Sequence, residues 1–214
     1  MSQQEDIPEA GLSLSRVVTS NSTPLKGVAP LSSLHFYRTV YLDPPWPESG
    51  GGKIKRGADK HYNLMTVSDI LNLPIPELSD ENCHIYLWVT NNYLPSGLMC
   101  LKEWGFRYVT NRAWIKDKIG LGQYFRGQHE LLLFGIKGKL PYKSSGNFTR
   151  SKSNVSSVIH AKRTEHSRKP PIYLDIEKIS YPPYIELFAR ERYEGWDVWG
   201  DESPDLIQKK IKGG

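Results

Sequence analysis

A strand that runs directly into two prolines is the strongest constraint in this sequence. Residues 37–42 are mostly apolar, β-branched or aromatic, which is typical of a buried strand. The chain then continues with Asp43, Pro44, Pro45 and Trp46. Because proline has a fixed φ and no amide hydrogen, the chain must leave the sheet here in a rigid, extended turn. We therefore expect a carboxylate, main-chain carbonyls and an indole at the carboxyl end of a strand, where open α/β sheets bind ligands.

These groups suit a planar amine attached to an aromatic base. The amino nitrogen of adenine is a poor nucleophile because its lone pair is delocalised into the ring. Asp43 and the Pro44 carbonyl can each accept one amine hydrogen, and Trp46 can stack on the base, a contact worth roughly 1–3 kcal/mol. The alternative is a plain strand-end turn with a solvated aspartate. The preceding strand and the tryptophan favour the binding turn.

The rest of the chain alternates between expected strands and helices. Strands are predicted at 84–89, 106–115, 130–136, 154–161, 184–190 and 195–202, and helices at 66–73, 93–104 and 171–179. This alternation indicates an α/β fold with a mainly parallel sheet and helices on both faces. Thr66 begins a Thr-x-x-Asp helix-capping pattern.

Five residues in or next to these elements are expected in the core. Trp88, Trp104 and Trp114 are predicted to pack there in preference to serving as base platforms. Cys83 and Cys100 are predicted to be reduced core thiols, since no Cys-x-x-Cys or His-rich spacing lies near them, and no metal site is expected.

Positive charge is concentrated between residues 137 and 169. This stretch holds nine Lys and Arg residues against Glu165 alone, so its net charge is 9 − 1 = +8, whereas the whole chain carries +5. Lys143, Arg150 and Lys152 lie among polar and aromatic residues, a composition typical of a groove that tracks phosphates. The alternative is a solvated charged face.

The motifs as a set resemble those of a known family. The turn at 43–46 resembles the signature of the DPPW-type adenine amino-methyltransferases, which include the catalytic subunit of the messenger-RNA N6-adenosine methyltransferase and its prokaryotic and ciliate DNA-modifying relatives. The likeness runs from about Val40 to about Glu202 and includes, in the family's order, Lys-Pro at 169–170, Glu-Leu-Phe-x-Arg at 186–190 and Trp-x-x-x-Gly at 196–200.

The resemblance implies a Rossmann-like class I methyltransferase sheet in the permuted order of the β class, with the catalytic turn first and the cofactor strand last. It also implies S-adenosylmethionine as methyl donor. Carried over residue by residue, it assigns the following residues: Asp43, Pro44, Pro45 and Trp46 to catalysis; Tyr62 and Glu130 to the substrate, with Lys143, Arg150 and Lys152 expected on its phosphates; and Asp43, Lys169, Leu187, Phe188, Arg190, Asp201 and Glu202 to the cofactor.

Within that assignment, Lys169 would pair with the methionyl carboxylate of the cofactor, and Glu130 would lie on the nucleic-acid and partner-facing edge. Ala189 and the pair Asp201-Glu202 depart from the messenger-RNA enzyme, which has a glycine and two amides there. The loop at 47–61 carries three consecutive glycines and is expected to be a mobile lid over adenine or a plain flexible connection.

The sequence therefore predicts a methyltransferase that forms N6-methyladenine in nucleic acid. DNA is favoured over RNA because no zinc finger or RNA module is recognisable. The alternatives are a non-catalytic nucleic-acid-binding subunit that supports an active paralogue, and an RNA N6-adenosine methyltransferase. A small-molecule methyltransferase would not explain the +8 stretch. The oligomer is left open between a homodimer and a pair with a paralogous subunit.

Length and hydropathy set the expected domain layout. The 214 residues suffice for one methyltransferase domain at 26–205, with a disordered tail at 1–25 and a short C-terminal tail at 206–214. No apolar run is long enough to span a membrane, so a soluble intracellular protein is expected, cytoplasmic in a prokaryote or phage and nuclear in a eukaryote.

Overall fold

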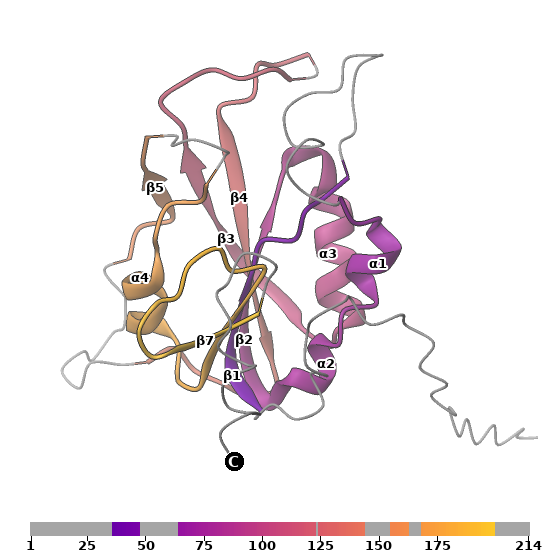
Figure 1. Cartoon of the computed structure of the whole chain (residues 1–214), viewed down its shortest axis with the longest axis vertical. Coiled ribbons are helices and arrows are strands. Elements are labelled where there is room, and N and C mark those ends of the chain that lie inside the picture. The colour runs from indigo at the N-terminus through magenta and orange to yellow at the C-terminus, as the bar shows by residue number, and fades with distance from the viewer. Residues whose placement is uncertain (1–35, 48–63, 123, 144–154, 163–167, 200–214) are drawn as a thin grey trace, which may run out of the picture. The chain divides into compact units, whose positions relative to one another are not determined.

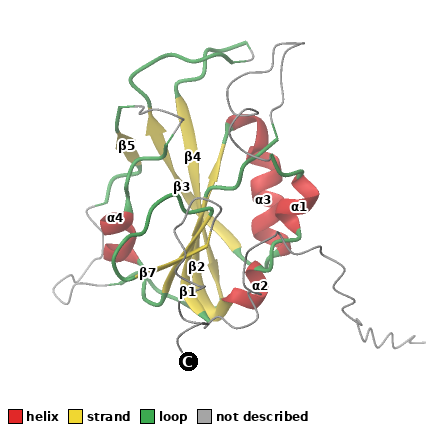
Figure 2. Ribbon diagram, viewed as in Figure 1, coloured by secondary structure: helices red, strands yellow, loops and turns green. Residues whose placement is uncertain are grey.

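A seven-stranded sheet organises the described part of the chain (Figures 1 and 2). The computed structural model describes residues 36–47, 64–122, 124–143, 155–162 and 168–199. The strands are β1 (Tyr37–Leu42), β2 (Ser79–Val89), β3 (Arg107–Ile115), β4 (His129–Lys137), β5 (Val158–His160), β6 (Tyr184–Leu187) and β7 (Trp196–Trp199). The expected tails and most of the loop at 47–61 lie outside the described residues, so the predicted domain boundaries stay predictions.

The strands lie in the order β5-β3-β4-β2-β1-β6-β7. β1 pairs in parallel with β2 and β6, β6 pairs in parallel with β7, and β3 pairs in parallel with β5. Only β4 is antiparallel to its neighbours β2 and β3 in this sheet. The described chain thus enters the sheet at β1, an inner strand, builds outward to β5, and returns to add β6 beside β1 and β7 beside β6. The mainly parallel sheet and the permuted order expected from the sequence are confirmed.

Helices cover both faces of the sheet. They are α1 (Val67–Leu71), α2 (Ile75–Leu78), the 3-10 turn η3 (Asn91–Tyr93), α3 (Leu94–Glu103) and α4 (Tyr173–Ile179). α3 packs against the side chains of Val89 and Leu133. α4 belongs to a core cluster that contains Trp88 and Leu132, the residues that precede those two in β2 and β4. Because successive strand residues point to opposite faces, α3 and α4 lie on opposite sides of the sheet, as Figure 1 shows.

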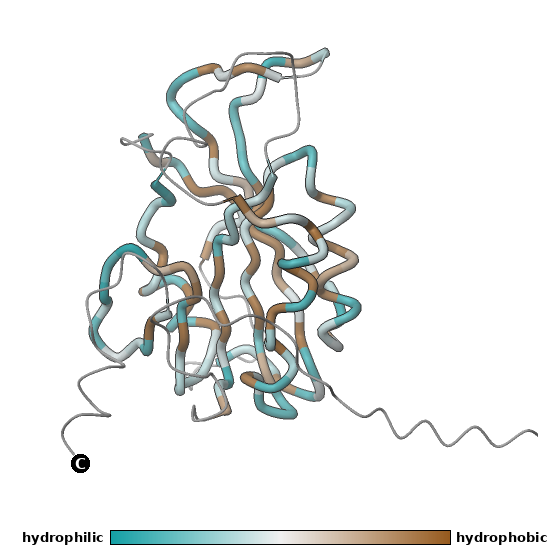
Figure 3. Tube along the Cα trace, turned by 45° about the vertical axis from the view of Figure 1, so that its right-hand side comes forward, coloured by the Kyte–Doolittle hydropathy of each residue, from teal (hydrophilic) through white to brown (hydrophobic). Residues whose placement is uncertain are grey.

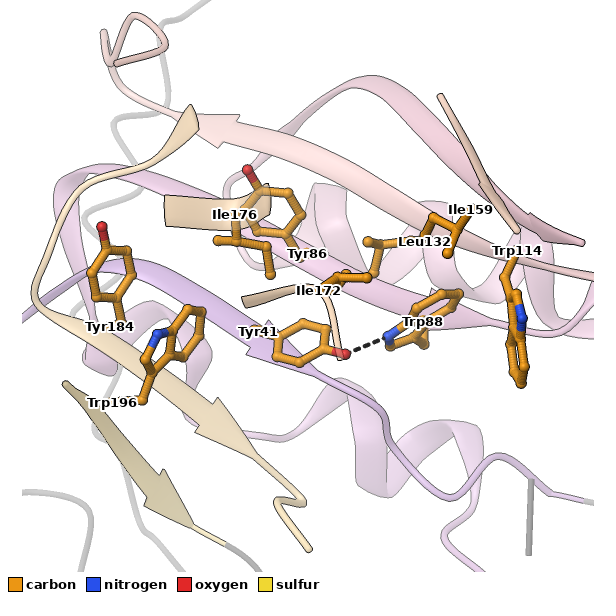
Figure 4. Packing of buried hydrophobic residues seen from close by; sticks show 10 residues of the cluster. All are labelled: Tyr41, Tyr86, Trp88, Trp114, Leu132, Ile159, Ile172, Ile176, Tyr184 and Trp196. Atoms are coloured by element: carbon orange, nitrogen blue, oxygen red, sulfur yellow. Dashed lines mark hydrogen bonds between the residues drawn. The ribbon is translucent and has the colours of Figure 1, made fainter. Parts of the chain in front are cut away.

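Aromatic residues fill the core on the α4 side (Figure 4). The Trp88 indole N–H donates to the Tyr41 hydroxyl oxygen at 2.8 Å, so this buried indole donor has a partner. Figure 3 shows hydrophobic residues recurring along the strands, and consecutive residues of β1 and β2 are buried, as expected for strands covered on both faces. The core expectations are confirmed: Trp88, Trp104 and Trp114 are buried, and both cysteines are buried and unoxidised.

Several element boundaries differ from the sequence prediction. β2 begins at Ser79, five residues before the expected His84, because parallel pairing with β1 already starts at Tyr37. The predicted helix at 66–73 is α1, slightly shorter than expected, whereas α2 was not predicted. α1 has the expected cap: the Thr66 hydroxyl oxygen accepts from the Asp69 amide, and the Asp69 carboxylate accepts from the Thr66 amide. No helix among the described residues is both long and apolar enough to cross a membrane.

Gly97 offers a test of how closely α3 packs on the sheet. A Cβ at this position would lie 2.5 Å from Val89 Cγ1 and 3.1 Å from Leu133 Cδ1. Val89 is β-branched and has little rotamer freedom to move away. We expect Gly97→Ala to lower the free energy of unfolding by about 1–3 kcal/mol, although alanine is the better helix former by about 1 kcal/mol. Urea denaturation measures this change.

The matched control is Lys102→Ala, which changes an exposed residue of the same helix. Its stability should stay within about 0.5 kcal/mol of the wild type. A Gly97→Ala variant as stable as the wild type would mean that α3 can move away from β2 at little cost.

Candidate active site

Asp43 and the turn after β6 meet at one edge of the sheet. Leu42, the last residue of β1, is in register with Leu187, the last residue of β6. Asp43 and Phe188 therefore leave adjacent parallel strands side by side. Phe188 has φ +63°, a left-handed conformation that is costly for a bulky residue. Its ring packs edge-on against the Trp199 ring, with the ring centroids 5.4 Å apart. Backbone strain of this kind concentrates at functional sites.

Hydrogen bonds fix the proline turn. The Pro44 carbonyl accepts the Trp46 amide at 2.8 Å, and the Pro45 carbonyl accepts the Met65 amide at 3.0 Å. Each carbonyl oxygen has a second lone pair, so the Pro44 oxygen can still accept one further hydrogen bond. The turn is thus rigid, and its polar atoms keep part of their accepting capacity.

Trp46 was expected to stack on the base, and this role stays a prediction. The side chain is buried at 8% exposure, and its indole N–H donates to the Trp88 carbonyl at 2.8 Å. The ring stacks on Tyr93 with centroids 5.4 Å apart. The indole therefore braces the turn against β2 and η3, because a buried Trp N–H takes a carbonyl partner where one is in reach.

Asp43 belongs to a network of four charged side chains. Lys169 Nζ lies 3.2 Å from Asp43 Oδ1 and 2.6 Å from Glu130 Oε2, and Glu130 also pairs with Lys116. Lys169 Nζ lies 5.5 Å from the centre of the Trp88 ring. Among the four side chains, Asp43 is the most open at 28% exposure, whereas Glu130 retains 9%. The network therefore presents one carboxylate, Asp43, toward solvent.

Glu130 was expected at the nucleic-acid-facing edge, and this role stays a prediction. Its side chain is buried and pairs with two lysines, Lys116 and Lys169. It is the second residue of β4 and lies in register with Trp114 of β3. Glu130 pairs with Lys169, which in turn pairs with Asp43. Lys116 was not singled out by the sequence, since a lysine after a strand has no distinctive local signal.

The charges in this network set one another's pKa values. Burial raises the pKa of Asp43, and Glu130 adds to the rise while Lys169 opposes it. Burial would also raise the pKa of Glu130, but Lys169 and Lys116 outweigh it and lower that pKa. Burial disfavours the charge of Lys169, yet the two carboxylates outweigh it and raise its pKa. Glu130 is thus the fixed anion, and Asp43 is the carboxylate that is less firmly ionised.

Glu186 is a functional candidate that the sequence reasoning missed. Burial raises its pKa to about 7, against the hydrogen bond that it accepts from the Tyr173 hydroxyl at 2.8 Å, and the charge of Asp43 adds to the rise. Tyr173 in turn stacks on Tyr193 at 4.2 Å. A carboxyl group perturbed in this way beside a strand-end site is a functional candidate. The feature of the sequence that could have identified Glu186 is its position as the first residue of the motif Glu-Leu-Phe-x-Arg.

The remaining predicted residues divide into three groups. Leu187 is buried, and Phe188 and Arg190 are half-buried. The positive charge of Arg190 acts to lower the pKa of Asp43, against the effect of burial. Lys143 is exposed and its ammonium donates to the carbonyl of Glu177 on α4. Outside the described residues lie Tyr62, Arg150, Lys152, Asp201 and Glu202.

One buried donor at this edge lacks a partner within the described part of the chain. The Trp199 indole N–H is buried and makes no hydrogen bond there. Trp199 ends β7 in register with Leu187 and contacts Phe188. Since buried donors are rarely left unpaired, this N–H marks a position where a polar ligand atom would be stabilised. The described residues contain no group of three or more side chains that could hold a metal ion.

Comparison with known proteins decides the family, since the MT-A70 family model matches residues 37–202. The chain belongs to the MT-A70 family. This match spans the proline turn at 43–46, the ion network and the motifs at 169–170 and 186–190, and it confirms the family named from the sequence. MT-A70 proteins are methyltransferases, and the α/β sheet agrees with their Rossmann-like fold.

Three relatives illustrate the range of the MT-A70 family. The chain is 29% identical over 203 residues to the Type II methyltransferase M.MunI of Mycoplasma sp, covering 85% of this chain and 84% of that protein. It is 28% identical to the N(6)-adenine-specific methyltransferase METTL4 of Homo sapiens, covering 78% and 37%. It is 29% identical to the N6-methyladenosine RNA methyltransferase MTA1 of Pyricularia oryzae, covering 80% and 48%. The chain thus spans most of the first relative and less than half of the other two.

The raised pKa of Glu186 predicts that this MT-A70 site limits stability at neutral and alkaline pH. The folded pKa of about 7 exceeds the ordinary value of 4.5, so protons are held in the folded state while the unfolded state has released them. Stability is therefore lost as the pH rises from 4.5 through 7. We expect Glu186→Gln, which stays neutral, to be more stable than the wild type at pH 8 by about 1 kcal/mol or more.

Chemical denaturation at pH 4 and pH 8 measures this difference, which should vanish at the lower pH. Glu194→Gln, at an exposed position near the end of the chain's described part, is the control and should show no such change. If Glu186→Gln matched the wild type at pH 8, the carboxyl group would not be destabilised by its surroundings.

Proposed function

We propose that this MT-A70 protein is an S-adenosylmethionine-dependent methyltransferase that forms N6-methyladenine in nucleic acid, with DNA favoured over RNA. The observation that carries the proposal is Asp43, held by Lys169 at the end of β1 beside the strained turn after β6. Names of relatives support it: METTL4 is named as N(6)-adenine-specific and MTA1 as acting on RNA. The relative matched over most of both chains is named a Type II methyltransferase.

Asp43 would orient the adenine amine. One amine hydrogen would bond to the Asp43 carboxylate and the other to the second lone pair of the Pro44 carbonyl, which turns the nitrogen lone pair outward. Lys169 keeps a positive charge beside Asp43 and so favours the ionised, accepting form despite burial. The amine proton becomes acidic once the nitrogen is alkylated, so no strong base is required. Rate would come mainly from alignment of the reacting groups.

The residues at this edge fit the methyl donor. Bound S-adenosylmethionine would supply an electrophilic methyl group on a sulfonium. Lys169 would pair with its methionyl carboxylate, and Leu187, Phe188 and Arg190 would line its ribose and adenine. The buried indole N–H of Trp199, without a partner in the described residues, supports a polar ligand at the ends of β6 and β7.

Glu130 explains how Lys169 could serve two partners. Lys169 Nζ lies closer to Glu130 than to Asp43, at 2.6 Å against 3.2 Å. Glu130 has a second lysine partner, Lys116, so its position does not depend on Lys169 alone. The ammonium would therefore stay fixed by Glu130 when a cofactor carboxylate approaches.

The Asp43 proposal is tested by labelled methyl transfer to single-stranded DNA, duplex DNA and RNA, followed by nucleoside analysis. We expect the wild type to form N6-methyladenine, with DNA the better substrate. Asp43→Asn places an amide N–H where an acceptor is needed, and methylation should fall by about 100-fold or more. Circular dichroism should show an unchanged fold.

Glu103→Gln, at an exposed position of α3, is the control and should keep full activity. An Asp43→Asn variant with near wild-type turnover would remove Asp43 from catalysis. A wild type that binds nucleic acid without methylating it would favour the alternative, a non-catalytic subunit. One relative, MTB of Arabidopsis thaliana, is named as such a subunit and is 27% identical over 135 residues.

The basic stretch predicts a salt-dependent contact with phosphates. Each neutralised phosphate should contribute about 0.7–0.9 to the slope of log affinity against log salt. Replacing Lys143, Arg150 and Lys152 together by Ala should flatten that slope and weaken DNA of any sequence about equally. Fluorescence anisotropy across a salt series measures it, and cofactor affinity should not change. An unchanged slope would mean that the stretch is a solvated face.

A further inference from the structure

A buried histidine that the proposed site does not use joins three parts of the chain. His84 lies in the middle of β2 and has no exposed surface. Its Nε2 lies 2.9 Å from the Leu140 carbonyl oxygen, and its Nδ1 lies 2.8 Å from the Ser180 hydroxyl oxygen. Leu140 follows β4, and Ser180 caps the carboxyl end of α4. The imidazole thus ties the segment after β4 and the end of α4 to a central strand of the sheet.

Hydrogen-bonding capacity fixes the tautomer of His84. A carbonyl oxygen can only accept, so Nε2 carries the hydrogen and Nδ1 is left as an acceptor. The Ser180 hydroxyl must therefore donate to Nδ1, and its oxygen accepts from the Tyr86 hydroxyl, 2.7 Å away. In the neutral form of the ring, each of these three hydrogens has an acceptor.

A proton on His84 would leave this buried cluster with one hydrogen too many. Nδ1 would then carry a hydrogen as well, so the hydrogens of Nδ1, Ser180 and Tyr86 would have to share two contacts. One of the three would lose its partner, and a buried donor without a partner is unfavourable. The cluster therefore accommodates the neutral ring and not the charged one.

The surroundings also oppose a positive charge on this ring. Among the described residues, the charged group that acts on His84 is Arg38 of β1, which lies over the Tyr181 ring at 4.6 Å from its centroid. The rings that face His84 bring no negative charge: Phe134 of β4 lies at 5.1 Å and Tyr181 at 6.4 Å between centroids. Burial lowers the pKa of His84 from its ordinary 6.5, against the hydrogen bond to the carbonyl, and Arg38 lowers it further.

The other titratable groups around the cluster do not supply a counter-ion. Cys83 Sγ lies 3.4 Å from the His84 carbonyl oxygen, and the Tyr184 hydroxyl donates to the Ser180 carbonyl at 3.0 Å. Burial raises the pKa of Cys83 and that of Tyr184 to about 12, and it raises the pKa of Tyr86 as well. All three groups therefore stay uncharged at neutral and acidic pH.

The segment tied down by the imidazole begins the basic stretch. Lys143 lies three residues after Leu140, and its amide donates to the Ile179 carbonyl of α4 at 2.7 Å. The Ser180 amide completes the last turn of α4 by donating at 2.8 Å to the carbonyl four residues earlier. Loss of the imidazole contacts would therefore loosen residues 140–143 and the end of α4 together.

We propose that His84, Ser180 and Tyr86 form a pH-sensitive lock, in which protonation of His84 releases residues 140–143 and the end of α4 from the sheet. The lock is closed at neutral pH, where the ring is neutral, and opens as the solution becomes acidic. It involves neither a cofactor nor nucleic acid, so its test is independent of the proposed function.

The direction of the stability change follows from proton binding. Because the pKa of His84 is lower in the folded protein than in the unfolded chain, the unfolded chain binds more protons below pH 6.5. The contribution of His84 to stability is complete above pH 6.5 and is lost as the pH falls from 6.5 through the folded pKa. His84→Gln binds no proton and keeps an amide donor for the Leu140 carbonyl, so it should lack this loss.

Urea denaturation at pH 7.5 and pH 5 measures the difference. On acidification, the unfolding equilibrium constant of the wild type should rise by about threefold or more relative to that of His84→Gln, since one unit of pKa shift corresponds to tenfold. His160→Gln changes an exposed histidine of β5 and is the matched control, with the pH dependence of the wild type. If the wild type and His84→Gln showed the same pH dependence, the proposal would be overturned.

NMR of the histidine rings tests the lock in the wild type itself, even if His84→Gln does not fold. The His84 ring resonance should titrate with a midpoint below pH 6.5. Ser180→Ala removes the hydroxyl at Nδ1, so the resonance that it shifts most is identified as His84. A midpoint at or above 6.5 would mean that the ring accepts a proton without penalty, which contradicts the proposal.

Hydrogen exchange tests the release of the two segments. Between pH 7.5 and pH 5, the protection factors of the Lys143 and Ser180 amides should fall by about threefold or more relative to those of β1, in the wild type and not in His84→Gln. If both amides keep their protection in the wild type at pH 5, protonation of His84 does not release these segments and the proposal is wrong.

Discussion

The ammonium of Lys169, buried between Asp43 and Glu130, is the interaction on which the site depends. It joins three parts of the chain that are far apart in sequence: the end of β1, the start of β4 and the segment before α4. Without a cation there, two carboxylates would face each other in a poorly solvated place, which is strongly unfavourable. With it, the carboxylate of Glu130 is fixed and that of Asp43 is held at the open side. The same contact therefore ties the ends of these segments together and, in the proposed function, orients the Asp43 carboxylate toward the amine.

The rigidity of the proline turn complements this ion network. Two prolines fix the direction in which the chain leaves β1, and Trp46 anchors the far end of the turn to the Trp88 carbonyl. Trp88 also presents its ring to Lys169 and donates its N–H to Tyr41 on β1. One core tryptophan thus connects the turn, the cation and the central strand. A substrate amine approaching Asp43 would meet an arrangement that is already formed, which reduces the cost of ordering the site.

Parallel pairing of β1 with β6 brings the two halves of the site together. The register that sets Leu42 beside Leu187 places Asp43 next to Phe188, although 145 residues separate these two positions (188 − 43). The strained Phe188, the protonatable Glu186 and the Trp199 N–H, which has no hydrogen-bond partner among the described residues, all lie on this second half. Each is unfavourable for the folded chain by itself. Their concentration beside Asp43 is what a binding site tuned for a ligand would show.

The sequence alone determined the elements and motifs whose physics is local. Periodicity marked the strands, Thr66 and Asp69 formed their expected cap, and the large apolar tryptophans went to the core, because each depends on neighbours along the chain. Only the tertiary structure decided the direction of β4, the burial of Glu130 between two lysines, the bracing role of Trp46 and the raised pKa of Glu186. These features arise from desolvation and from contacts between distant residues. Such contacts leave no pattern in the sequence around any one of the residues involved.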